Sequence, residues 1–228
     1  MSIPLSQDKI KDLLGKRAAE LVEPGMIVGL GTGTTAHHFI LHLANRCKTG
    51  LSITAVPSSE QSLQLAQKHG IPLFPVDKIT AIDLTIDGAD EVDSARRMIK
   101  GGGGALLREK IVAYASHKVI IITDTSKVVE KLGHHPLPVE IVPFGHEITK
   151  RHIDALNLKS QWRTNTQGDL WISDNGNYIL DISFPLMDNP EREEARLVQI
   201  PGVVETGFFL DFADEVLVGH PDGHIRSL

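Results

Sequence analysis

Cysteine is almost missing from this sequence. Cys47 is the one cysteine among 228 residues, so no disulfide can form within the chain and no cysteine-based metal site can be built. A lone thiol fits a reducing compartment. The apolar content of 41% is ample for a large core. We therefore expect a cytoplasmic protein that folds without covalent cross-links.

Long apolar runs and an excess of positive charge are also missing. The first 22 residues, MSIPLSQDKIKDLLGKRAAELV, lack the apolar core of a signal peptide, and no stretch approaches the length of a membrane span. The net charge of −6 and the pI near 6.0 argue against nucleic acid or an anionic membrane as the main partner. A local cationic pocket for a phosphorylated small molecule remains compatible with this balance.

The sequence has eleven histidines but no metal-binding pattern. No HExxH is present, and His38 and His42, one turn apart on a predicted helix, are more typical of a helix surface. Asp87, Asp90 and Asp93 lack the alternate-position oxygens and the loop glycine of an EF-hand. We expect no metal and no cofactor.

Alternating strand and helix patterns dominate the first half of the chain. A helix is predicted over residues 6–22 with Ser6 as its cap, and a strand from Met26 leads through a glycine and threonine turn into a second helix. Three more strands are expected: one at residues 51–56, one that ends near residue 86, and one at residues 117–123. This order predicts an α/β fold: an open, mostly parallel Rossmann-like sheet with helices on both faces.

The pattern changes near His134. From there the sequence predicts strand, helix, two strands, helix and strand, which is the split βαβ order of a ferredoxin-like α+β domain, with a hairpin turn at Asn175-Gly176. A last strand, ADEVLVG, is expected to return to the main sheet. We predict a catalytic domain at residues 1–132 and 209–228, and a smaller inserted domain at 133–208.

The turn GTGTTA at residues 31–36 matches a dinucleotide-binding pattern. That interpretation needs an acidic residue after the next strand, but the strand at 51–56 runs into Pro57, Ser58 and Ser59. Hydroxyl groups suit a phosphate or a sugar better. In the alternative without a ligand, the threonines only cap the following helix.

Polar residues follow two further strands at the edge where α/β sheets bind ligands. Asp87 and Asp90 in DGAD suit hydroxyl binding or proton transfer, although an Asp-rich turn is the simpler alternative. Lys127 follows the strand at 117–123 and could equally be a solvated lysine.

Residues 100–110, KGGGGALLREK, combine a cation, four glycines and a carboxylate at the start of a predicted helix. Bare glycine amides at a helix N-terminus suit an anion. The helix has Leu107, Ile111 and Tyr114 or Ala115 on one face. Glu109 has no basic residue three or four positions away, which favours a role as a general base. Lys100 is then placed to stabilise the negative charge that such a base creates on the substrate. The alternative is a flexible linker before a helix whose Glu109 faces water.

The segments GLGTGTTA, PSSEQS, DGADEVD, KGGGGALLREK and DTSK, in this order and spacing, closely resemble the ribose-5-phosphate isomerases of the A type. The resemblance covers nearly the whole chain, and Thr34 stands where the family often has serine. It implies that Glu109 is the proton acceptor and that the sugar phosphate is contacted by Thr32, Gly33, Thr34, Thr35, Asp87, Gly88, Ala89, Asp90, Lys100, Gly101, Gly102, Gly103 and Lys127.

The resemblance further implies the interconversion of D-ribose 5-phosphate and D-ribulose 5-phosphate in the pentose phosphate pathway, without metal, by a homodimer or a homotetramer. Asp87 would help to open the furanose ring, Glu109 would move the proton between the second and first carbons, and Lys100 would hold the enediolate oxygen. Other functions compatible with the sheet are a non-catalytic sugar-phosphate sensor, an amino-sugar phosphate isomerase and a CoA transferase.

Overall fold

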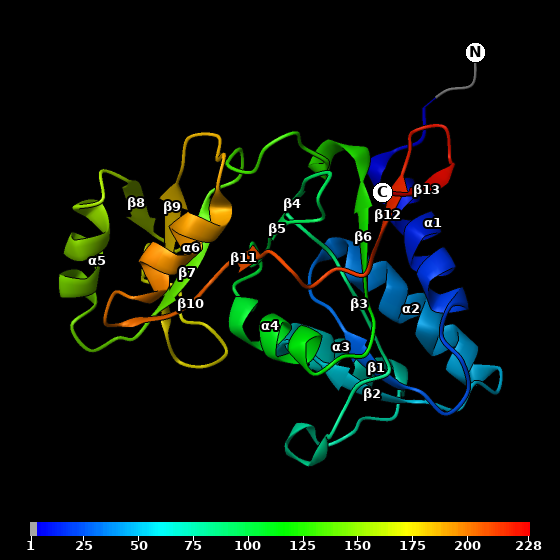
Figure 1. The fold of residues 1–228 in the computed structure, drawn as a ribbon. Helices are drawn as coiled ribbons and strands as arrows, with labels where there is room; N and C mark the ends of the chain where they lie inside the picture. Colours follow the sequence, from blue (N-terminus) through cyan, green and yellow to red (C-terminus); the bar gives the residue numbers. More distant parts are fainter. Residues whose placement is uncertain (1–3) are drawn as a thin grey trace. The chain divides into compact units, whose positions relative to one another are not determined.

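A computed structural model of the chain describes residues 4–228, and its contacts divide them into two compact units (Figure 1). The larger unit takes in the chain up to Ala89, Arg108–Val128 and Asp211–Leu228. The smaller unit takes in Asp90–Leu107 and Val129–Leu210. No helix of the described residues is long and apolar enough to cross a membrane.

The larger unit is built on a six-stranded sheet in the order β13-β12-β6-β3-β1-β2. Neighbours from β12 to β2 pair in parallel, which confirms the predicted open α/β sheet, and β12 is the predicted returning strand ADEVLVG. The strands are β1 (Ile27–Leu30), β2 (Thr54–Pro57), β3 (Leu84–Asp87), β6 (Val119–Asp124), β12 (Glu215–Gly219) and β13 (Ile225–Ser227).

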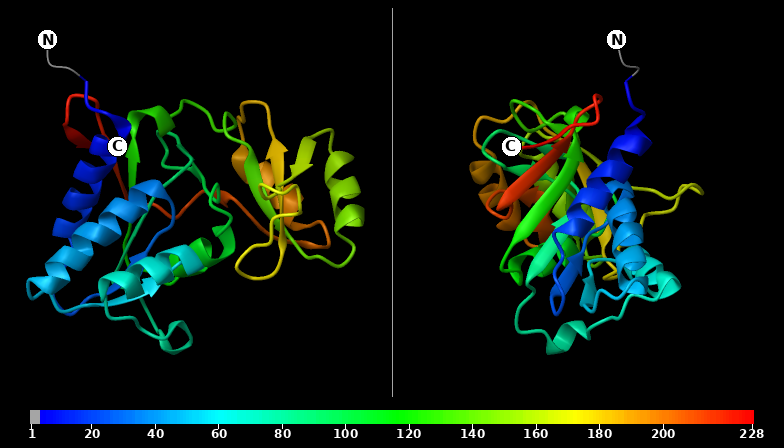
Figure 2. Two further views of the ribbon diagram at one scale, coloured as in Figure 1. Left: turned by 180° about the vertical axis from the view of Figure 1, so that it is seen from behind. Right: turned by 90° about the vertical axis from the view of Figure 1, so that its right-hand side faces the viewer.

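Helices cover both faces of this sheet (Figure 2). The core on one face joins Val28, Leu30 and Leu84 to apolar residues of three helices. Gly29 and Thr85, which alternate with those residues, face the other side, where Val112 of the fourth helix packs. The helices of the first face are α1 (Gln7–Glu20), α2 (Thr34–Lys48) and α3 (Glu60–His69), and α4 (Leu106–Tyr114) lies on the second.

Helices α1 and α2 approach each other very closely. A Cβ atom on Gly15 would lie 2.5 Å from the backbone nitrogen of Phe39, so only glycine fits at this crossing. Beside it, His42 Nε2 lies 2.7 Å from Asp12 Oδ1. Hydrogen bonds from Lys9 and His42 lower the pKa of Asp12 to about 2. The carboxylate therefore stays charged at neutral pH and joins the two helices.

The smaller unit contains a four-stranded antiparallel sheet in the order β10-β7-β9-β8, covered on one face by two helices. This is the predicted split βαβ arrangement, with Gly176 at φ +78° in the expected hairpin turn. Its elements are β7 (Leu137–Ile141), α5 (His146–Asp154), β8 (Lys159–Trp162), β9 (Tyr178–Ser183), α6 (Pro190–Val198) and β10 (Val203–Thr206).

Two details differ from the sequence analysis. Residues 90–107, expected in the larger domain, group with the smaller unit, because β4 (Glu91–Val92) and β5 (Met98–Ile99) form a small sheet with β11 (Phe208–Phe209). The strand ADEVLVG is not the last one, because β13 follows it and pairs with it in an antiparallel manner. The domain division at residues 133 and 208 stays a prediction about units that fold separately.

The crossing of α1 and α2 generates a test. Helix propensity alone predicts that Gly15→Ala stabilises the protein by about 1 kcal/mol. We expect the opposite, a loss of roughly 1–3 kcal/mol in the free energy of unfolding, because the added methyl group meets backbone atoms that cannot move aside. Urea unfolding measures the difference, and Lys16→Ala on the exposed side of the same helix is the control. Equal or higher stability of Gly15→Ala would refute the close crossing.

Candidate active site

Asp87 ends β3 and is held by main-chain amides. Its side chain is 3% exposed, and Oδ1 accepts hydrogen bonds from the nitrogens of Thr32, at 3.0 Å, and Gly88, at 2.7 Å. A Cβ atom on Gly31 would lie 2.1 Å from the same oxygen. The glycine at the end of β1 is therefore required for this contact. Thr32 and Asp87, which the sequence analysis placed at the ends of two strands, do come together.

The GTGTT turn leads directly into α2. Gly33, at φ +98°, is the N-cap residue, and no side chain caps the helix. The hydroxyl of Thr32 instead bonds to Ser58, at 3.0 Å, and to Ser59, at 2.8 Å. The alternative in which the threonines serve only as helix caps therefore does not hold. The first amides of α2 point into the turn, as anion-binding helix N-termini do.

Lys11 is a candidate site residue that the sequence analysis did not name. Its Nζ donates a hydrogen bond to Thr34 Oγ1 over 2.9 Å. The ammonium group of Lys11 thus lies at the N-terminus of α2. An anion bound there would be stabilised by both the lysine charge and the helix dipole. Nothing in the pattern of the first helix separates Lys11 from its other lysines, because the contact depends on how α1 crosses α2.

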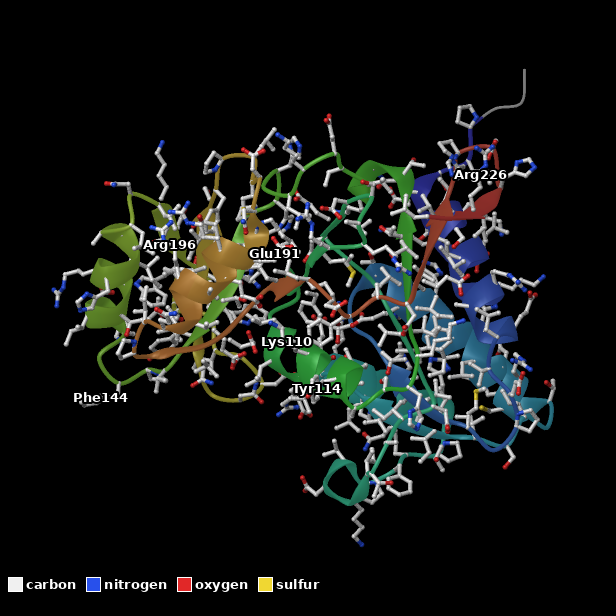
Figure 3. The ribbon with its side chains drawn as sticks, in the orientation of Figure 1. Lys110, Tyr114, Phe144, Glu191, Arg196 and Arg226 are labelled. Carbon is white, nitrogen blue, oxygen red and sulfur yellow. The ribbon has the colours of Figure 1, made fainter. Side chains whose placement is uncertain are left out.

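Glu109 lies on the buried face of α4 and is 4% exposed. The predicted apolar face is the outward one, since Ile111 is 53% and Tyr114 86% exposed (Figure 3). The large apolar side chains do not form the buried face here, because small side chains on the opposite face let α4 lie close to the sheet. The buried positions around Glu109 are Ala105, Leu106, Val112 and Ala113.

The burial of Glu109 among these apolar side chains has a cost in folding free energy. Burying a charged group among apolar side chains opposes folding, and no basic residue stands three or four positions from Glu109 to form an intrahelical ion pair. Buried acids are often found at functional sites. The alternative in which Glu109 faces water is excluded by its burial.

Lys127 closes the short 3-10 helix η2 (Thr125–Lys127) after β6 and is half-buried. Asp124 caps that helix by accepting a hydrogen bond from the nitrogen of Ser126 at 2.9 Å. Because β1, β3 and β6 run parallel, Lys127 stands at the same sheet edge as Asp87 and the GTGTT turn.

In the smaller unit the glycine stretch forms a defined turn. Gly101, at φ +95°, and Gly104, at φ +79°, adopt conformations that favour glycine. The nitrogen of Gly104 donates to the oxygen of Gly101 at 2.8 Å, and that of Gly102 to Asp90 Oδ2 at 2.7 Å. These contacts contradict the flexible-linker alternative.

Lys100 precedes this turn and is 3% exposed. Its backbone nitrogen donates to the oxygen of Gly207 at 2.9 Å. Its Nζ lies 5.2 Å from the ring centroid of Phe209, within the range of a cation–π contact. The backbone of Lys100 is thus held next to the β5–β11 pair, and its side chain contacts Phe209.

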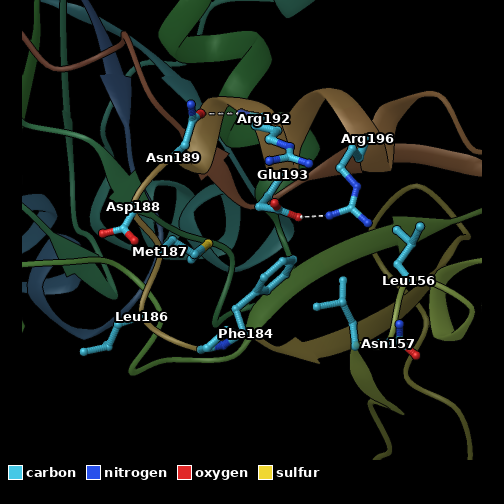
Figure 4. Close-up of a pocket in the computed structure, with 12 residues that line it drawn as sticks. Leu156, Asn157, Phe184, Leu186, Met187, Asp188, Asn189, Arg192, Glu193 and Arg196 are labelled. Atoms are coloured by element: carbon cyan, nitrogen blue, oxygen red, sulfur yellow. Dashed lines mark hydrogen bonds and ion pairs between the residues drawn. The ribbon is translucent and has the colours of Figure 1, made fainter.

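The structure thus distributes the predicted residues over both units. Thr32–Thr35, Asp87–Ala89, Glu109 and Lys127 belong to the larger one, and Asp90 and Lys100–Gly103 to the smaller. None of them lines a cavity of about 400 Å³ in the smaller unit beside α6, where Arg196 pairs with Glu193 (Figure 4). Among residues 4–228 no group of three or more histidine, cysteine or acidic side chains could hold a metal ion.

The fold and these side chains define an α/β protein with an anion-binding turn, a backbone-held aspartate and a buried glutamate. Residues 54–223 match the family model of ribose 5-phosphate isomerase A, also called phosphoriboisomerase A. The chain belongs to this family. It is 44% identical over 225 residues to the ribose-5-phosphate isomerase A of Parvibaculum lavamentivorans, covering 96% of this chain and 97% of that one. The Listeria monocytogenes protein is 43% identical over 218 residues, with the same coverage.

Solved structures agree with this assignment. The ribose 5-phosphate isomerase A of Methanocaldococcus jannaschii superposes with a TM-score of 0.92 at 37% identity, covering 98% of this chain and 99% of that one. A D-ribose-5-phosphate isomerase in complex with phospho-erythronic acid gives 0.92 at 38% identity, covering 100% and 99%. The Plasmodium falciparum enzyme gives 0.93 at 35% identity, covering 97% and 98%.

Proposed function

We propose that this protein interconverts D-ribose 5-phosphate and D-ribulose 5-phosphate through an enediolate, with Glu109 as the base. Family membership assigns the reaction, an aldose–ketose isomerisation of the pentose phosphate pathway. The observation that supports the base is the burial of Glu109 on α4. A general base typically contributes a factor of roughly 100 to 10,000 in rate.

Ring opening comes first. The hydroxyl proton on the first carbon leaves, the bond from that carbon to the ring oxygen breaks, and the ring oxygen gains a proton. Asp87 suits this exchange, because two amides hold its carboxylate in place at the end of β3. The product is the open-chain aldehyde.

Proton transfer between carbons follows. Glu109 takes the proton from the second carbon, and the electron pair moves through the new carbon–carbon double bond to the aldehyde oxygen. Glu109 then returns a proton to the first carbon, while the hydroxyl proton of the second oxygen passes to the first oxygen. The base is regenerated, and no net proton or electron is consumed.

Lys100 and the amides of the glycine stretch are assigned to the enediolate oxygen. A fixed cation or amide donor aimed at a developing negative charge is worth roughly 3 kcal/mol in the transition state. The buried position of Lys100 supports this role, because a partly desolvated cation acts more strongly than a hydrated one.

The phosphate group is assigned to the start of α2 and to Lys11. Amides at the helix N-terminus, the hydroxyls of the GTGTT turn and a lysine form a site suited to a phosphate. A relative was solved with phospho-erythronic acid, which carries both a phosphate and a carboxylate. The remaining contacts to sugar hydroxyls are assigned to Gly88, Ala89, Asp90 and Lys127.

The enzyme is further proposed to work in the cytoplasm as a homodimer, with a homotetramer as the alternative. The lone Cys47 supports a reducing compartment, and the family resemblance supports the assembly. Light scattering after size-exclusion chromatography distinguishes the two oligomers from a monomer.

Catalysis is tested in deuterated water. The wild-type protein with ribose 5-phosphate is expected to form ribulose 5-phosphate with solvent deuterium on the first carbon, because the proton held by Glu109 exchanges with solvent. Glu109→Gln is expected to lower kcat by roughly 100- to 10,000-fold, because the amide cannot accept the proton. NMR measures the label and the rate.

The exposed Glu130→Gln is the matched control and should keep wild-type activity. Binding of phospho-erythronic acid to Glu109→Gln, measured by calorimetry, shows that the variant is folded. Binding of ribose 5-phosphate by the wild type without ketose formation would instead identify a sugar-phosphate sensor. An active Glu109→Gln would remove this residue from the mechanism.

Lys11→Ala tests the phosphate assignment. The phosphate takes no part in bond making, so we expect KM to rise by about three- to tenfold while kcat stays within about twofold. Steady-state kinetics at low and high salt should show a weaker salt dependence of KM in the variant. Lys16→Ala on the same helix should behave like the wild type. An unchanged KM in Lys11→Ala would place the phosphate elsewhere.

A further inference from the structure

The four-stranded sheet β10-β7-β9-β8 has a second face, opposite to the one that α5 and α6 cover. Leu137, Val139 and Ile141 of β7 point into the core with α5 and α6, so the residues between them face the opposite side. Residues 163–177, which join β8 to β9, fold over that side. Glu140, fully buried, holds the end of this segment.

Three donors of the segment converge on one oxygen of Glu140. Ser173 Oγ lies 2.8 Å from Oε1, Asn177 Nδ2 2.9 Å and Asn175 Nδ2 3.1 Å. A buried carboxylate with several hydrogen bonds fixes the segment strongly. The other end begins at Arg163, whose nitrogen donates to the oxygen of Ile179 on β9.

Arg163 connects this sheet to the glycine stretch. Its Nε lies 2.9 Å from Asp181 Oδ2 and its Nη2 2.5 Å from Oδ1, a bidentate pair on β9. Its Nη1 donates to the carbonyl oxygens of Gly101, at 3.0 Å, and Gly102, at 3.1 Å. The side chain is 15% exposed. One guanidinium group thus joins a carboxylate to two consecutive peptide groups.

Those two contacts determine where the next two amides point. Each peptide group is planar and trans, so its N–H points away from its C=O. Holding the carbonyl of Gly101 directs the N–H of Gly102, which donates to Asp90, and holding the carbonyl of Gly102 directs the N–H of Gly103. Glycine torsions are otherwise unusually free. Trp171 packs against the same turn, since a Cβ atom on Gly104 would lie 2.8 Å from its Nε1.

We propose that Arg163, anchored by Asp181, is a positioning residue that directs the amide of Gly102 to Asp90 and orients the amide of Gly103 for the reaction. This inference rests on the proposed function, in which the amides of the glycine stretch meet the enediolate oxygen. Lysine cannot replace the arginine, because an ammonium group lacks the planar fork that serves a carboxylate and two carbonyls together.

The test compares Arg163→Lys and Asp181→Asn with the wild type and with Arg151→Lys, an exposed position in the same unit. We expect kcat of Arg163→Lys to fall roughly 10- to 100-fold, because misdirected donors cost about this much. Asp181→Asn keeps the guanidinium group but removes the carboxylate that anchors it, so its kcat should fall less than that of Arg163→Lys. Inhibition by phospho-erythronic acid, whose carboxylate would accept a hydrogen bond from the amide of Gly103, should weaken in parallel with the fall in kcat. Inhibition by inorganic phosphate should stay the same.

Circular dichroism and urea unfolding identify any variant that fails to fold, and in that case Asp181→Asn decides the question. Wild-type kcat and inhibition in a folded Arg163→Lys would overturn this inference while the wild-type isomerase activity stands. Equal weakening of both inhibitors would also overturn it, because a general structural defect acts on both. If the wild type itself forms no ketose, the proposed function fails first.

Discussion

A carboxylate buried on an apolar helix face is the constraint on which the proposed chemistry depends. Glu109 is 4% exposed and lies on the same buried face of α4 as Leu106, Val112 and Ala113. Such a position opposes folding, because water solvates the charge better than a protein interior does. The position makes physical sense if the group must approach a carbon-bound proton away from solvent, where a base is most effective.

The other groups of the candidate site are held in place by contacts within the protein. Asp87 is held by two amides and by the bare backbone of Gly31, and Lys100 by strand pairing and the ring of Phe209. Arg163 extends this arrangement to the glycine stretch. Donors that are already oriented do not need to reorganise during the reaction, which is the main source of electrostatic catalysis in enzymes.

Local patterns predicted most of the fold and supplied most of the candidate site residues. The parallel sheet, the ferredoxin-like order and the polar strand ends follow from periodicity and turn residues, which are properties of neighbouring positions. Lys11 and Arg163 could not be found in this way, because their partners are 23 and 61 to 62 positions distant in sequence. The apolar face of α4 that periodicity predicts points outward, because the small side chains on the opposite face pack against the sheet. The grouping of residues 90–107 depends on pairing with β11, which comes late in the chain.

The most direct measurement is a crystal structure of Glu109→Gln with ribose 5-phosphate bound. The account predicts an open-chain sugar with the amide of residue 109 about 3 to 3.5 Å from both the first and second carbons, the distance at which a proton can be transferred. It also predicts Lys100 at the oxygen of the first carbon. A sugar bound with both carbons well beyond the reach of residue 109 would contradict the account.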